Sequence, residues 1–219
     1  MRFRCAAASV AALACLAAAP ALAASPCDGL ERYVPTAKTA LRSPEPKVRN
    51  DIPYNELKTI PGATRASLLG LTQFARATDH SYEVETIDAP DGNGVCVALR
   101  EVNLAIVHTI LRIFIADHVH EGSCTYDVTM LHERDHVAYE RGALKKALLE
   151  IRKEIAKPAR WVHGDAEAEA LKTIERRIDK WSKTLLKRAT KVAKRGHGYL
   201  DIQSNIRGSL AKCPRWQRK

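Results

Sequence analysis

The chain has 219 residues, of which 46% are hydrophobic, and a formal net charge of +10. This length suits one domain with a buried core, and no apolar stretch beyond the N-terminal segment is long enough to cross a bilayer, which excludes a transmembrane anchor. The positive charge suits an anionic envelope surface as a partner. Many Lys and Arg residues are mixed with Glu and Asp on predicted helices, however, which is typical of solvated helix faces and does not indicate specific nucleic-acid binding.

Residues 1–24 have the organisation of a secretory signal peptide. Arg2 and Arg4 form a basic start, the segment Ala6–Ala19 is apolar, and small residues typical of a cleavage site follow. We therefore expect an exported protein, periplasmic or secreted. Its mature chain, residues 25–219, is expected to form a single domain.

The first part of the mature chain, residues 25–120, is expected to be mostly β-structure. The Pro-rich segment Ser25–Thr59 predicts an extended entry with one short strand, and the apolar spacing over Ser67–Ala77 predicts a short helix. Strand-forming residues and a turn signal at Asp91–Gly94 then indicate four strands: Tyr82–Ile87, Val95–Leu99, Val102–Val107 and Ile110–Ile115. These segments predict a small, mostly antiparallel sheet.

The second part, residues 121–219, is expected to be mostly helical. One helix is predicted from Cys124–Val128 to about Ala156, where a Lys-Pro pair stops it. Another, capped by Asp165, runs to about Arg195, and its apolar residues recur every three or four positions. The sequence therefore predicts an α+β fold, in which a long antiparallel helical hairpin follows the small sheet.

The first of these helices contains the pattern His-Glu-x-x-His, at His132, Glu133 and His136. Residues four apart share one helix face, so both histidines can bind the same zinc ion. At about 100° of rotation per residue, the histidines lie beside the apolar stripe of the helix and Glu133 lies in line with it. A carboxylate there needs a partner or a task, and Glu133 is the predicted catalytic base. The alternative is a pair of surface histidines on an ordinary helix.

A zinc ion that also holds a water molecule needs a third protein ligand. Glu140 continues the i, i+4, i+8 series, but its Cα lies about 12 Å along the helix from that of His132, which favours a supporting role. The predicted hairpin returns the end of the second helix to the level of His132, and that end carries His197 and Asp201. His197 is the favoured third ligand, with Asp201 orienting an imidazole. Two alternatives stay open: Asp201 is itself the third ligand, or Asp201 only caps the helix and His197 is exposed.

Four cysteines lie in the mature chain, which in an exported protein predicts two disulfides. They are widely separated and form no Cys-x-x-Cys pair, which argues against a thiolate zinc site. The hairpin brings Cys213 back towards Cys124 and so favours a disulfide between them. Cys27 and Cys96 are then left as the other pair.

Several features follow one another along the chain: the Gly-Ser-Cys-Thr-Tyr segment at Gly122–Tyr126, the His-Glu-x-x-His helix, His197-x-x-x-Asp201, and then Cys213 and Trp216. In this layout the chain resembles exported bacterial proteins of unknown function that are classed as candidate zinc-dependent, zincin-like proteases. The resemblance covers most of the mature chain and is sharpest over residues 122–137, while Glu140 matches no clear pattern in it. It implies zinc binding and peptide hydrolysis, without naming a substrate.

The sequence thus predicts an exported zinc metallopeptidase that acts on a peptide or protein. His132 and His136 would bind zinc, and Glu133 would deprotonate the attacking water. The alternative is a non-catalytic envelope protein, with a structural or vestigial zinc site and a basic surface for an anionic partner.

Overall fold

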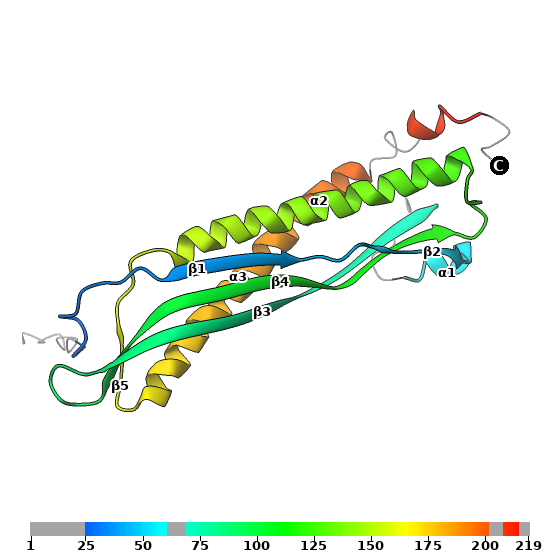
Figure 1. Cartoon of the computed structure of the whole chain (residues 1–219). Helices are drawn as coiled ribbons and strands as arrows, with labels where there is room; N and C mark the ends of the chain where they lie inside the picture. The colour runs from blue at the N-terminus through cyan, green and yellow to red at the C-terminus, as the bar shows by residue number, and fades with distance from the viewer. Residues whose placement is uncertain (1–24, 61–68, 202–207, 215–219) are drawn as a thin grey trace, which may run out of the picture.

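The structure is a computed structural model, and it describes residues 25–60, 69–201 and 208–214. The predicted signal peptide, residues 1–24, lies outside the described residues. The elements follow in the order β1 (Thr36–Arg42), β2 (Lys47–Ile52), α1 (Tyr54–Leu57), β3 (Gly70–Asp88), β4 (Val95–Ala116), α2 (Cys124–Ile155), β5 (Val162–Gly164) and α3 (Glu167–Leu200) (Figure 1).

Strand β4 is the centre of a five-stranded sheet. The neighbouring strand β3 pairs with it in antiparallel fashion along nearly its whole length, from Gly70 opposite Ile115 to Asp88 opposite Val95. This pairing fills one edge of β4. The registers therefore place β5, β1 and β2 one after another along the other edge, with β5 antiparallel to β4 and both β1 and β2 parallel to it.

The predicted fold class, a small and mostly antiparallel sheet followed by a helical hairpin, is wrong. The path β1-β4-β2 is parallel, and the helices pack on a long sheet. The segment Ser25–Thr59 supplies two strands where one was expected, because its partner is the distant strand β4, and local alternation does not identify a distant partner. The helix predicted over Ser67–Ala77 is also wrong, since β3 begins at Gly70 and pairing with β4 overrides a short helical spacing.

Both long helices pack on one face of the sheet. Val102, Leu104 and Ile106 are alternate residues of β4 and so share a face. They form one buried cluster with residues of both helices, namely Leu144, Leu148 and Ile151 of α2 and Ile174, Ile178 and Leu185 of α3. The two helices cross, and the end of α3 lies beside the first half of α2 (Figure 1). The crossing brings the last residues of α3 to the His-Glu-x-x-His motif.

The boundaries of α2 have clear local causes. Gly122 has a positive φ of 79°, and Ser123 then caps the helix by accepting a hydrogen bond from the Tyr126 N–H at 3.1 Å. The helix ends at Ile155, shortly before Pro158, which cannot donate a main-chain hydrogen bond. This extent matches the helix predicted from the sequence. It fixes the rotation of the motif relative to the sheet.

Two disulfides join distant parts of the chain in the pairing expected from the sequence. Cys27 is bonded to Cys96, and Cys124 at the start of α2 is bonded to Cys213 beyond the end of α3. Two disulfides are consistent with an exported protein. Within the described residues, no helix is both long enough and apolar enough to span a bilayer.

Candidate metal centre

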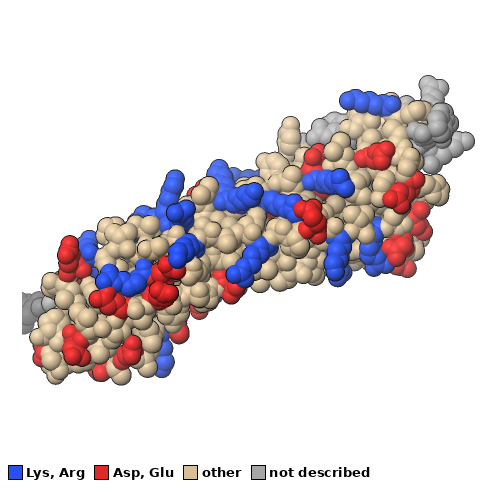
Figure 2. Space-filling view, viewed as in Figure 1, with Lys and Arg blue, Asp and Glu red and all other residues tan. Residues whose placement is uncertain are grey.

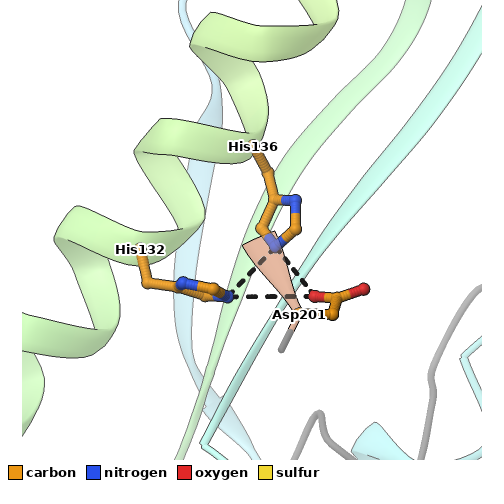
Figure 3. A group of neighbouring side chains, drawn as sticks. All are labelled: His132, His136 and Asp201. Carbon is orange, nitrogen blue, oxygen red and sulfur yellow. Dashed lines mark hydrogen bonds and ion pairs between the residues drawn. The ribbon is translucent and has the colours of Figure 1, made fainter. Parts of the chain in front are cut away.

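Three electron-pair donors from two helices converge at one point. His132 and His136 project from α2, and Asp201 caps the end of α3. Their imidazole nitrogens and carboxylate oxygen point toward one another in Figure 3. The Nε2 atoms of His132 and His136 are 3.1 Å apart. Oδ1 of Asp201 lies 3.1 Å from Nε2 of His136 and 3.9 Å from Nε2 of His132.

This triad fits the geometry of a zinc site. Zinc binds His nitrogen and Asp oxygen at about 2.0–2.2 Å, and a tetrahedral arrangement then places any two ligand atoms about 3.3–3.5 Å apart. The three separations of 3.1, 3.1 and 3.9 Å bracket that value. Among the described residues, the His, Cys, Asp or Glu side chains that could together hold a metal ion are those of His132, His136 and Asp201. Their ligand atoms all lie within 4.8 Å of one another.

The acidic member of the triad is ionised. Burial acts to raise the pKa of Asp201, but hydrogen bonds from His132 and His136 outweigh it and hold that pKa well below its usual range. Asp201 is therefore a carboxylate. Its side chain is 36% exposed, against 13% for His132, so the triad opens to solvent on the Asp201 side.

Glu133 is buried against the sheet, with only 4% of its surface exposed. The Thr72 hydroxyl donates a hydrogen bond to its Oε2 at 2.7 Å. A Cβ atom on Gly70 would lie only 2.9 Å from Oε1, so the glycine leaves the room that this carboxylate occupies. Burial raises the pKa of Glu133, although the bond from Thr72 opposes the rise. A carboxyl with a raised pKa beside a metal site is suited to exchanging protons.

His197 lies behind His136 and is not part of the triad. Its Nδ1 is 3.0 Å from Nδ1 of His136, and its Nε2 is 3.2 Å from Oε2 of Glu140. Glu140 has no exposed surface and also faces Arg76 at 3.2 Å and His108 at 3.7 Å. Burial acts to raise its pKa, but the contacts with His108 and His197, with the charge of Arg76, lower it to about 2.

Strand β3 supplies a row of contacts that the sequence analysis missed. Alternate residues of a strand share a face, and Thr72, Phe74 and Arg76 all face α2 and α3. Thr72 contacts Glu133, the Phe74 ring stacks on that of His197 with centroids 5.1 Å apart, and Arg76 pairs with Glu140. The expected helix over this segment hid the i, i+2 spacing that marks these residues. His108 faces the same cluster from β4.

The contacts fit a single assignment of ring protons. An Nε2 that binds metal carries no proton, so His136 would then carry its proton on Nδ1 and donate it to Nδ1 of His197. The proton of His197 is then on Nε2 and is donated to Glu140. Every nitrogen in this line has a partner of the right kind, and the buried Glu140 charge is compensated.

Comparisons with known proteins found no relative of this chain. No protein-family model matches the chain, and neither a curated protein nor a solved structure matches it.

Proposed function

We propose that the protein is a zinc-dependent metallopeptidase that is exported to the periplasm or secreted. The observation that carries the proposal is the convergence of His132, His136 and Asp201, with ligand atoms at zinc-like separations, beside the buried carboxyl of Glu133. The two disulfides support the exported location.

Each residue near the centre has a role in this proposal. His132, His136 and Asp201 hold the zinc ion, which when bound supplies Lewis-acid chemistry for a carbonyl and for water. Glu133 accepts a proton from the attacking water and passes it to the leaving amine. Thr72 holds Glu133 in place through its hydrogen bond. His197, the ligand favoured by the sequence, instead orients His136.

The test compares the purified protein with its Glu133→Gln variant. We expect both to bind zinc, because Glu133 is not a ligand, and we expect hydrolysis of casein to fall by about 10²–10⁴-fold in the variant. Metal content is measured after zinc loading and desalting, and circular dichroism verifies the fold.

Two outcomes would count against the proposal. A folded, zinc-loaded protein that retains no zinc would remove its basis. Full zinc occupancy without any turnover that depends on Glu133 would favour the non-catalytic envelope protein with a structural zinc site.

A further inference from the structure

The exposed side of α3 carries a regular line of lysines. Lys180, Lys183, Lys187, Lys191 and Lys194 are all exposed, and we refer to them as the lysine row. At about 100° of rotation per residue they fall within a sector of about 80°. Arg176 lies in the same sector one turn earlier, so the charged line from Arg176 to Lys194 is about 27 Å long.

The positive charge of the row is not neutralised locally. No Asp or Glu occurs between Lys180 and Leu200. None of the five lysines forms an ion pair with another described residue, whereas Arg188, on the flank of the row, pairs with Glu154 of α2 at 2.7 Å. A surface hollow of about 390 Å³ lies over the first half of the row, with Asp179 as its one acidic member; it is lined by Arg176, Asp179, Lys180, Lys183, Thr184 and Lys187.

The row leads to the candidate metal centre. Asp201 falls at the edge of the same sector of α3, two turns beyond Lys194, which is about 10 Å along the axis. It is also the side on which the triad opens to solvent. In the view of Figures 1 and 2, α3 lies largely behind the sheet and α2, and the face that is seen carries both basic and acidic side chains along its length.

We propose that the lysine row binds an acidic segment of the polypeptide that the metal centre cleaves. A row one side chain wide matches a single extended chain better than a flat membrane. Successive lysines are about 4.5–6 Å apart along the axis, close to the spacing of about 6.6 Å between alternate residues of an extended peptide. The cleavage rests on the proposed function, but the binding does not require the metal.

The binding test uses a fluorescein-labelled, Glu-rich peptide of about eight residues, which spans about 27 Å when extended. Fluorescence anisotropy at low salt compares the wild type with Lys183→Gln/Lys187→Gln/Lys191→Gln. We expect roughly tenfold weaker binding by this variant, as removal of three exposed charge contacts implies. The control, Lys145→Gln/Lys146→Gln/Lys153→Gln, removes the same charge from α2.

Three results would overturn the assignment. Equal loss in both variants would mean that only net charge matters. Equally tight binding of a Gln-rich peptide would mean that the row does not select acidic residues. Binding of heparin hexasaccharide or phosphatidylglycerol vesicles through the row, with no binding of the acidic peptide, would assign it to another class of partner.

Cleavage is measured separately on two peptides with the same central sequence, one with Glu and one with Gln in its flank. We expect kcat/KM to be higher for the acidic peptide in the wild type, and this preference to disappear in the row variant. Equal kcat/KM values in the wild type would overturn the substrate class. Row-dependent binding without any hydrolysis would contradict the proposed peptidase function alone.

Discussion

A histidine nitrogen binds a metal ion only when it carries no proton, so metal binding by the triad would require the proton of His136 to lie on Nδ1. His197 and Glu140 control that position through the two contacts of 3.0 and 3.2 Å. A fixed carboxylate at the far end would also strengthen the donor nitrogen of a metal-binding ring. The burial of Glu140, which would be costly without partners, is offset by its contacts with Arg76 and His197.

His197→Phe and Glu140→Gln are each expected to weaken zinc binding by about 10–100-fold, because they remove a bond that orients His136. Competition with a chromophoric chelator measures the affinity, and His80→Asn, on an exposed histidine of β3, is the control. Asp201→Asn and His136→Ala should cause a greater loss. A loss in His197→Phe as large as that in His136→Ala would instead make His197 a ligand.

The residues of the site differ in how far the sequence could reveal them. The spacing of His132 and His136 is local, and one helix suffices to bring them together. Asp201 was found from the lengths of two helices, which sufficed to bring it to His132 but not to rank it above His197. Arg76 was out of reach, because its contact with Glu140 depends on the strand β3 and on how that strand passes under α2.

At the scale of the elements, α2 and α3 cross with a close contact at one glycine. A Cβ atom on Gly196 would lie 1.8 Å from the ring of Tyr139, so a side chain there would force that ring to move. From the sequence, this helix was predicted to end at about Arg195. The helix continues to Leu200 because the glycine serves close packing and not a turn.

Gly196→Ala is therefore expected to lower the free energy of unfolding by about 1–3 kcal/mol. Gly198→Ala is the matched control, since nothing lies within 4 Å of its added Cβ and alanine favours a helix by about 0.8–1 kcal/mol. Urea denaturation followed by circular dichroism measures both. A similar stability change in the two variants would refute the close-packing role of Gly196.

The strands illustrate why single strands can be predicted from the sequence more easily than the pairing between them. Three separate strands were predicted where β4 is continuous, yet the predicted gaps are real irregularities. Arg100 and Thr109 are skipped in the pairing with β3, at its two register shifts. Both skipped residues fall in the predicted gaps, but the prediction of separate strands was wrong, because local composition does not show that pairing continues across a bulge. The parallel partners β1 and β2 could not be inferred, because parallel pairing joins segments far apart in the chain.

At the scale of the whole molecule, the two disulfides have different relations to the metal centre. Cys124–Cys213 ties the start of α2 to the segment beyond α3, near Asp201 in the chain. Cys27–Cys96 lies at the start of β4, toward the far end of the sheet (Figure 1). The first closes 89 residues of chain and the second 69.

Removing either disulfide by paired Cys→Ser substitutions is expected to cost about 2–5 kcal/mol of stability. Only the loss of Cys124–Cys213 should also weaken zinc binding, because it frees the chain end that presents Asp201. Urea denaturation and chelator competition measure the two effects. Equal zinc affinity in both double variants would show that this disulfide does not hold the centre together.

The shared edge of β4 has a consequence for the order of folding. Strands β1 and β2, which pair along this edge, precede β4 in the chain, whereas β5 follows α2. No N-terminal fragment of the chain can therefore complete the sheet until β5 has been made. Such non-local closure slows folding, because loop entropy is lost before the contacts form. For a protein that is exported as proposed, late closure keeps the chain free of a finished sheet while it is still being synthesised and is yet to cross the membrane.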